Sequence, residues 1–334
     1  MPQKRELDVN GRKVQVSNLD KLLYPAAGFT KGDVLNYYIG VSHYLLPHLK
    51  GRPVTLKRFP DGIAGKFFYQ KDVPASTPKW VKTFPVPRRA GGKDICYTVI
   101  DDLPTLVWCA NRASLELHPF LHRAPRIDRP TSLVFDLDPG EGADILQCIE
   151  VAFLLKDILG RWNFQTFPKV SGSKGLQLYL PLNTVVTYDV TRPFAKGIAQ
   201  FLAVKHPKLI VAEMAKAERK QRVFIDWSQN SDFKTTVGVY SLRAKRQYPF
   251  VSLPVTWDEL EHARKSKTHD GLYYQPGAAL ERLEKMGDLF APVLQLKQHL
   301  RSDFLAQLEA KPARAKRQTR ITPANESIKH GVQE

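Results

Sequence analysis

Apolar residues recur at helical spacing between Thr30 and Leu49. Every third or fourth position is apolar or aromatic, as in a helix that packs one face against a core. Thr30 followed by Asp33 approximates a capping box at the start, and the sequence GRP stops the helix at the other end. The pattern predicts a helix over residues 30–49, whose apolar face is formed by Val34, Tyr37, Tyr38, Val41, Tyr44 and Leu45.

The remainder of the first half combines short strand-like runs with one further helix. A polar strand-like segment covers residues 8–17, and VTLKRF, GKFFYQK and DICYTVI are β-type runs separated by proline and glycine turns. The segment PTLVWCANRASLELH, residues 104–118, is predicted to be helical. Together these elements predict an N-terminal α/β module.

The second half alternates strands and helices more regularly. Such an alternation, with strands that return through helices and a hairpin, predicts an α+β sheet with helices on one face, related to ferredoxin-like split βαβ units. The strands are expected in TSLVFDLDPG, FQTFPKVS, LQLYLPL and RVFIDWS, and the helices at residues 143–159 and 191–206.

Composition indicates a globular protein with a polyanionic partner. The 334 residues are 43% hydrophobic and carry a net charge of +17, which attracts nucleic acid or, as the competing interpretation, a membrane surface. The polar start MPQKREL and the short apolar run VAFLL contain no signal or spanning segment, so a cytoplasmic location is expected. Cys96, Cys109 and Cys148 are widely spaced and form no CxxC, which argues against a disulfide framework or zinc knuckle.

The last residues differ in character from the rest of the chain. After about residue 308 the sequence lacks periodic apolar positions and is rich in lysine, arginine, proline and glutamine. This composition predicts a disordered basic tail over residues 309–334.

Three aspartates are the first candidates for chemistry. In LVFDLDPG the two-residue period of a strand puts Asp136 and Asp138 on one face and Leu137 in the core. Asp226 lies in the apolar strand VFIDW, where an unpaired carboxylate is costly. Carboxylates that repel one another suit hard divalent metals, and three of them fit two-metal phosphoryl transfer. The alternative for Asp138 is a role limited to the turn formed with Pro139.

The loop SGSKG lies between two apolar strands and is suited to an anion. Its small residues let backbone N–H groups approach a phosphate, and Lys174 adds a positive charge. It lacks the spacing of a Walker A loop, and a simple polar hairpin is the alternative. Further cations that flank the aspartates are Arg219, Lys220, Arg222, Arg243, Lys245 and Arg246, for which solvated surface charge is the alternative.

Weaker candidates lie in the first half. Lys31 at the predicted helix start, with Lys21 nearby, suits a phosphate. Phe67 and Phe68 lie among basic residues and suit stacking on a base, although adjacent aromatics are often one core and one rim residue. His118, at the expected helix end, is either a site residue or a structural histidine.

Several long motifs together resemble one family. SNLDKLLYP, GRPVTLKRFPDG, LVFDLDPGEG, SGSKGL, RVFIDWSQN and YSLRA, in this order over residues 10–265, resemble the polymerase domain of bacterial ATP-dependent DNA ligase D, a member of the archaeo-eukaryotic primase superfamily. The resemblance implies two small sheets with flanking helices in one compact catalytic domain over residues 1–308. Within it we expect an N-terminal α/β module at about 1–128 and a ferredoxin-like or RRM-like catalytic module at about 129–308.

The resemblance also implies roles for individual residues. Asp136, Asp138 and Asp226 would bind two Mn²⁺ or Mg²⁺ ions, with Mn²⁺ giving the best activity and ribonucleotides often preferred over deoxyribonucleotides. The incoming nucleotide would be bound by His118, Ser171, Lys174 and Arg243, with Gln177, Arg219 and Gln229 close by. Asn18, Lys21 and Lys31 would recognise a downstream 5′-phosphate, and Phe67 and Phe68 would stack near the templating base.

Departures from the family pattern qualify these expectations. Gln177 stands where the family usually has histidine, so nucleotide affinity is expected to be lower. The stretch between His118 and Asp136 is short, and the ligase is expected to be a separate partner. The leading hypothesis is gap filling and end extension during non-homologous end joining, with DNA, Ku and a ligase as partners. The alternatives are gap filling in excision repair, a non-catalytic end-bridging protein and a metal-dependent nuclease.

Overall fold

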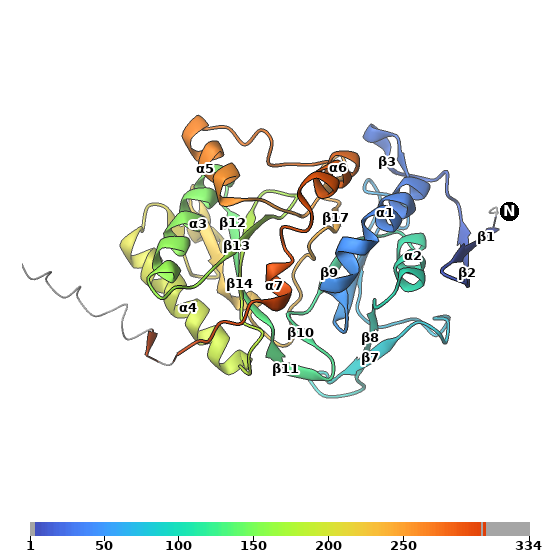
Figure 1. Cartoon of the computed structure of the whole chain (residues 1–334), viewed down its shortest axis with the longest axis horizontal. Coiled ribbons are helices and arrows are strands. Elements are labelled where there is room, and N and C mark those ends of the chain that lie inside the picture. Colours follow the sequence, from blue (N-terminus) through green and yellow to red (C-terminus); the bar gives the residue numbers. More distant parts are fainter. Residues whose placement is uncertain (1–3, 302, 305–334) are drawn as a thin grey trace, which may run out of the picture.

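The computed structural model describes residues 4–301, 303 and 304, and Figure 1 shows their arrangement. Two larger sheets and their helices lie side by side, with helices α6 (Pro276–Met286) and α7 (Pro292–Gln295) between the two halves in that view. The predicted basic tail, residues 309–334, lies outside the described residues. Among the helices of the described part, none has the length and apolar character needed to cross a membrane.

The chain begins with a hairpin where a single strand was predicted. Strands β1 (Lys4–Val9) and β2 (Arg12–Ser17) pair antiparallel. Asn10 and Gly11 join them, and both have positive φ angles, 52° and 75°, as a type I′ turn requires. The Asn-Gly pair inside the predicted strand is therefore the turn.

The first predicted helix is confirmed. Helix α1 (Lys31–Leu49) follows a short pair of strands, β3 (Leu22–Tyr24) and β4 (Phe29–Thr30), with the 3₁₀ turn η1 (Pro25–Ala27) between them. Thr30 and Asp33 form the complete capping box. The apolar face of α1 is buried except at Tyr44, which is partly exposed.

The first sheet has five strands, and β5 is its centre. The order is β6-β5-β8-β7, and β9 also pairs with β5. All pairings are antiparallel. The strands are β5 (Pro53–Arg58), β6 (Phe68–Gln70), β7 (Thr83–Val86), β8 (Ile95–Val99) and β9 (Ser114–Pro119).

The helix predicted over residues 104–118 is wrong in its second half. Helix α2 (Leu103–Asn111) ends early, because Ala113 adopts a left-handed φ of 55°. The chain then continues as β9, which aligns His118 with Thr55 and Glu116 with Lys57 on β5. The sequence SLELH alternates with a period of two, so Glu116 and His118 point to the same side of the sheet.

The second sheet contains the predicted strands of the second half. Its order is β15-β16-β12-β14-β13-β19, with only the β15–β16 pair parallel. Figure 1 places helices α3 (Ile145–Gly160), α4 (Tyr188–Lys205) and α5 (Trp257–Ser266) together on the outer side of this sheet. Helix α4 begins three residues before the predicted Thr191. The strands are β12 (Ser132–Pro139), β13 (Phe167–Val170), β14 (Leu176–Pro181), β15 (Ile210–Val211), β16 (Val223–Asp226) and β19 (Leu253–Pro254).

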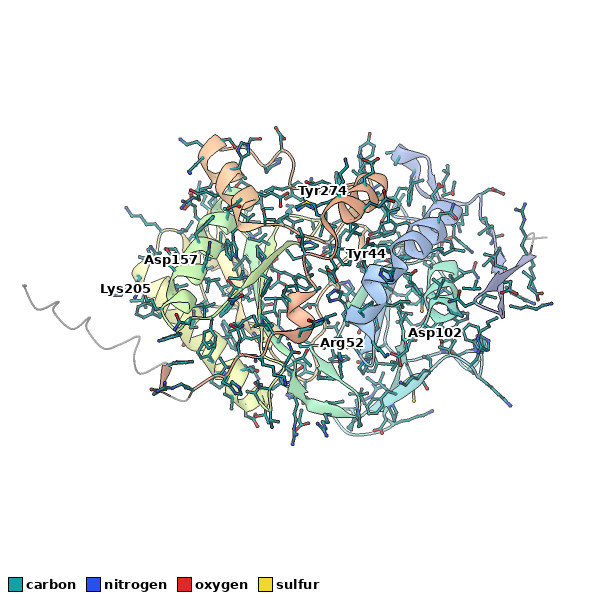
Figure 2. All side chains as sticks on the ribbon, in the orientation of Figure 1. Tyr44, Arg52, Asp102, Asp157, Lys205 and Tyr274 are labelled. Carbon is teal, nitrogen blue, oxygen red and sulfur yellow. The ribbon has the colours of Figure 1, made fainter. Side chains whose placement is uncertain are left out.

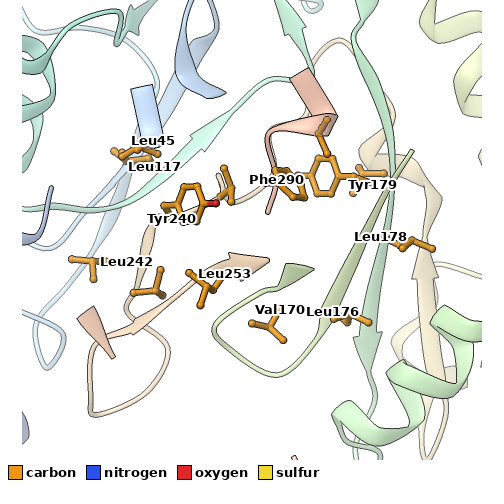
Figure 3. Close-up of a cluster of buried hydrophobic side chains, with 14 of the residues drawn as sticks. Leu45, Leu117, Val170, Leu176, Leu178, Tyr179, Tyr240, Leu242, Leu253 and Phe290 are labelled. Carbon is orange, nitrogen blue, oxygen red and sulfur yellow. The ribbon is translucent and has the colours of Figure 1, made fainter. Parts of the chain in front are cut away.

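Shorter elements connect the two sheets. They are β10 (His122–Arg123), β11 (Arg126–Pro130), β17 (Leu242–Arg243), β18 (Phe250–Val251) and the 3₁₀ turns η2 (Lys216–Arg219) and η3 (Trp227–Gln229). One hydrophobic cluster spans both sheets, and in Figure 3 Leu117 of β9, Tyr240 and Leu176 of β14 belong to it. Arg52, labelled in Figure 2, also joins the halves, since its buried guanidinium donates to the carbonyl of Leu121 at 2.6 Å and to Oγ1 of Thr131 at 2.7 Å.

The expected architecture, two small sheets with flanking helices, is therefore present. The finer division into modules at about residue 128 stays a prediction, because the hydrophobic core runs continuously through both halves.

Candidate active site

Two antiparallel strands bring the three aspartates together. Asp136 of β12 lies directly opposite Asp226 of β16, and Asp138 follows Asp136 on the same face of β12. Leu137 between them is fully buried, as predicted. Burial together with the charges of Asp138 and Asp226 raises the pKa of the Asp136 carboxyl above its usual range. The carboxylates therefore repel one another, and a cation would relieve this repulsion.

The Asp226 carboxylate is engaged by its own neighbours. Its Oδ1 accepts hydrogen bonds from the backbone N–H and the hydroxyl of Ser228, and Oδ2 accepts one from Nε2 of Gln229 at 2.8 Å. Within residues 4–301, 303 and 304, no three His, Cys, Asp or Glu side chains stand in an arrangement that could hold a metal. The donor set suits Mn²⁺ or Mg²⁺ chemically, and Oδ2 of Asp226 keeps a lone pair beside its hydrogen bond from Gln229.

A cleft of about 1090 Å³ opens beside these strands. Asp136 and Asp138 contribute to its wall, together with all seven residues predicted to bind nucleotide and several further cations. Arg222, which pairs with Glu218, does not line the cleft. The predicted nucleotide residues that line it include Ser171, Lys174, Arg219, Gln229 and Arg243, and the further cations are Lys71, Lys234, Lys245 and Arg246.

The remaining two predicted nucleotide residues, His118 and Gln177, also line the cleft, and their neighbours were not predicted. Gln177 of β14 lies opposite Asp136 on one side and Lys169 on the other. Its Oε1 accepts a hydrogen bond from Nζ of the fully buried Lys169 at 2.7 Å. Gln177 thus connects Lys169 to Asp136, and it is only 2% exposed. Because the Gln177 side chain is buried beside Asp136, it has little surface for contact with a nucleotide.

The loop SGSKG is held in a compact form by its own first serine. Oγ of Ser171 accepts hydrogen bonds from the N–H groups of Ser173 at 3.2 Å and Gly175 at 3.3 Å. A Cβ at Gly175 would lie 2.2 Å from the carbonyl oxygen of Leu137, so only glycine fits there. Arg246 holds the loop from outside by donating to the Ser173 carbonyl at 2.6 and 3.1 Å. The Lys174 side chain remains exposed to the cleft.

Glu116 lies behind the cleft wall and was not predicted. Its buried carboxylate accepts a hydrogen bond from Nε2 of His118 at 2.9 Å and forms an ion pair with Nη1 of Arg243 at 3.1 Å. Burial lowers the pKa of His118, and the hydrogen bond to Glu116 opposes that shift. The histidine therefore lies at the end of β9 with a fixed ring orientation, in contrast to the helix end that was expected.

The predicted aromatic pair divides between the two faces of the first sheet. Phe67 packs on Phe59, with ring centroids 5.3 Å apart, whereas Phe68 lies near Arg58 on the other face. Tyr69, which was not predicted, shares the face of Phe67, lines the cleft and is 53% exposed. Its ring lies 6.1 Å from His118. The alternation of FFY along the strand could have indicated Tyr69.

A second pocket, of about 320 Å³, lies apart from the cleft. Asn18 and Lys21 line it together with Arg5, and the Lys31 N–H donates to the Lys21 carbonyl at 2.8 Å. Burial and the charge of Lys21 lower the pKa of Lys31 to about 8. Nζ of Lys21 is held by Asp61 at 2.8 Å. The three predicted phosphate residues thus lie together at the start of α1.

Comparison with known proteins agrees with this arrangement. The family described as LigD, primase-polymerase domain, matches residues 30–290. The multifunctional non-homologous end joining protein LigD of Mycolicibacterium smegmatis is 39% identical over 288 residues, which cover 84% of this chain and 36% of the relative. The bifunctional non-homologous end joining protein LigD of Bacillus subtilis is 36% identical over 251 residues, 75% of this chain and 40% of the relative. The chain therefore spans less than half the length of these relatives.

A solved structure resembles most of the described fold. The polymerase domain from Mycobacterium tuberculosis ligase D, in complex with DNA, superposes with a TM-score of 0.78 at 39% identity. The match covers 85% of this chain and 99% of that domain. The chain accordingly belongs to the LigD primase-polymerase domain family.

Proposed function

We propose that the chain is a template-directed, metal-dependent nucleotidyltransferase that fills short gaps and extends broken DNA ends. The observation that carries this proposal is the single cleft in which Asp136 and Asp138 face the SGSKG loop, His118 and Arg243. Acidic groups for a metal and basic groups for a triphosphate are both needed for nucleotidyl transfer. A nuclease has no need for the basic wall.

The basic wall would bind the triphosphate of the incoming nucleotide. Lys174 supplies an exposed positive charge, and Arg243 offers planar donors that match phosphate oxygens. Arg219 is fixed by its bond to the Met214 carbonyl at 2.7 Å and by the ring of Phe224. Gln229 supports Asp226, so its role in nucleotide binding is indirect.

Asp136, Asp138 and Asp226 would hold two Mn²⁺ or Mg²⁺ ions. Such ions supply Lewis acidity at the α-phosphate and lower the pKa of an attacking hydroxyl. The raised pKa of the Asp136 carboxyl, caused by burial and by its acidic neighbours, favours a bound cation. We propose Mn²⁺ as the more effective ion and ribonucleotides as the preferred substrates, following the family resemblance.

The second pocket would bind a 5′-phosphate on the downstream strand. Lys21 and Lys31 bring two positive charges to the start of α1, where the helix dipole also favours anions. The relatives are named for non-homologous end joining, and the similar structure was in complex with DNA. We therefore propose DNA ends as the substrate and Ku and an ATP-dependent DNA ligase as partners, acting in the cytoplasm at the nucleoid.

The direct test is extension of a labelled primer across a one-nucleotide gap that bears a 5′-phosphate. Mn²⁺ with UTP or dTTP opposite adenine would show both addition and sugar preference, and Asp136→Ala would be the control. Addition that disappears in the variant supports the proposal. Shortening of the primer would indicate a nuclease, and tight gap binding without addition would indicate an end-bridging protein.

A further inference from the structure

The buried carboxylate of Glu116 behind the cleft wall is contacted by four nitrogen donors. The side chain is 1% exposed, and its oxygens accept three hydrogen bonds and form one ion pair with an arginine. Four donors converge on it: Nζ of Lys57 and the N–H of Ala244 on Oε1, at 3.1 Å each, and His118 and Arg243 on Oε2. Because the carboxylate is buried among these groups, it is out of reach of water and substrate, and Glu116 acts only through its partners.

The partners of Glu116 come from strands that are far apart in the sequence. Lys57 is directly opposite Glu116 in the β5–β9 register, and Arg243 belongs to β17 in the second half of the chain. The neighbouring backbone is also fixed, since the Leu117 N–H donates to Oγ of Ser241 at 2.9 Å. Glu116 therefore joins the first sheet to the segment that supplies Arg243.

The role of Glu116 goes beyond packing, because its buried carboxylate carries a negative charge. Burial alone would raise its pKa, but the hydrogen bond from His118 and the charges of Arg243, His118 and Lys57 hold the pKa well below its usual range. The carboxylate is thus ionised throughout the physiological range. It holds Arg243 at Nη1 alone, while Nε of Arg243 has no hydrogen-bond partner among the described residues.

The other side of Glu116 faces the aromatic residues. Nζ of Lys57 lies 4.4 Å from the ring centroid of Phe67 and 5.7 Å from that of Tyr69. Lys57 is 2% exposed, and burial lowers its pKa while Glu116 raises it. Glu116 therefore holds the Lys57 ammonium group in place beside the rings of Phe67 and Tyr69.

We propose that Glu116 is a positioning residue that holds His118 and Arg243 in place for a nucleoside triphosphate and, through Lys57, fixes the aromatic face formed by Phe67 and Tyr69. This inference rests on the proposed function, because the ligand of His118 and Arg243 is taken to be a nucleotide. Glutamine at position 116 keeps the shape and one acceptor oxygen. It replaces the other oxygen with an amide donor, which opposes the donor group of Arg243.

The test measures binding of UTP with Mn²⁺ in the absence of DNA. Glu116→Gln is expected to raise the Kd for UTP roughly 10- to 100-fold, since hydrogen bonds between charged groups lose their geometry. In gap extension the KM for UTP rises similarly. Glu259→Gln is the matched control, because Glu259 forms a two-pronged ion pair with Arg282, at 2.6 and 2.7 Å, outside the cleft. It should bind UTP like the wild type.

A double variant tests whether Glu116 positions Arg243 and His118 or only neutralises the charge of Lys57. In Lys57→Met with Glu116→Gln the buried ammonium is removed, so thermal stability lost in Glu116→Gln should return. If Glu116 positions Arg243 and His118, the double variant still binds UTP weakly. Recovery of wild-type UTP affinity in the double variant would overturn the proposal, as would wild-type affinity in Glu116→Gln alone.

Primer extension by the wild-type protein, measured in parallel, distinguishes a failure of the Glu116 proposal from a failure of the proposed function. A wild-type protein that binds UTP but adds no nucleotide overturns the proposed function and leaves the role of Glu116 to be decided by the binding data. A wild-type protein that does not bind UTP with Mn²⁺ overturns both.

Discussion

Nζ of Lys169 lies 2.7 Å from Oε1 of Gln177, which is directly opposite Asp136 on the neighbouring strand. Lys169 is fully buried and also donates to Oγ of Ser252 at 2.6 Å. Because the oxygen of the Gln177 amide is occupied, its N–H₂ group is left to donate to Asp136, where it lowers the carboxyl pKa. The residue that departs from the family pattern thus lies in a chain of contacts from Lys169 to the acidic site.

Lys169→Met is expected to change how stability depends on pH. Burial lowers the pKa of Lys169 to about 7 from its ordinary value of 10.5. Between these values the folded state binds fewer protons than the unfolded state, so the Lys169 contribution to the free energy of unfolding rises with pH by up to about 1.4 kcal/mol per pH unit. The methionine variant lacks this contribution, and its advantage over the wild type should shrink from pH 7 to pH 9 in urea denaturation.

Lys208→Met, at an exposed lysine, is the control for this measurement. Its stability should follow the wild-type curve at every pH. Parallel curves for Lys169→Met and the wild type would show that Lys169 keeps an ordinary pKa in the folded protein.

Asp136→Asn is expected to abolish nucleotide addition and yet to stabilise the metal-free protein. Burial and repulsion from Asp138 and Asp226 raise the pKa of Asp136, so the folded state binds more protons and loses stability as pH rises. Removing the charge should increase the free energy of unfolding by about 1 kcal/mol, more at pH 8 than at pH 5. Denaturation in EDTA measures this, and Mn²⁺ should then stabilise the wild type more than the variant. A destabilised variant would indicate a structural aspartate.

Local sequence patterns predicted the aspartates and the start of α1 but missed Glu116. The period of a strand was enough to put Asp136 and Asp138 on one face, and the Thr30–Asp33 pair marked the start of α1. Glu116 was missed because residues 114–118 fit a helix as well as a strand when taken alone. Their pairing with β5 decides the matter, and that pairing is set by residues more than fifty positions away.

Lys21→Ala with Lys31→Ala is expected to remove the preference for a 5′-phosphorylated downstream end. These lysines lie together at the start of α1, apart from the cleft, so extension of a simple primer-template should be unchanged. Because burial and Lys21 lower the pKa of Lys31 to about 8, the wild-type preference should weaken between pH 7 and pH 9. Extension rates on gaps with and without the phosphate measure both effects. Equal losses on both substrates would contradict a phosphate-specific role.

Tyr69→Ala is expected to impair extension more than Phe68→Ala, because the two rings lie on opposite faces of β6. Tyr69 lines the cleft beside His118, whereas Phe68 lies 5.0 Å from the guanidinium of Arg58 on the other face. A stacked base loses about 1–3 kcal/mol when its aromatic partner is removed, so the KM for nucleotide or gapped DNA should rise about fivefold or more in Tyr69→Ala. Tyr69→Phe keeps the ring and should remain near wild type. If Phe68→Ala were the more damaging change, the base would stack on the face of β6 that carries Phe68.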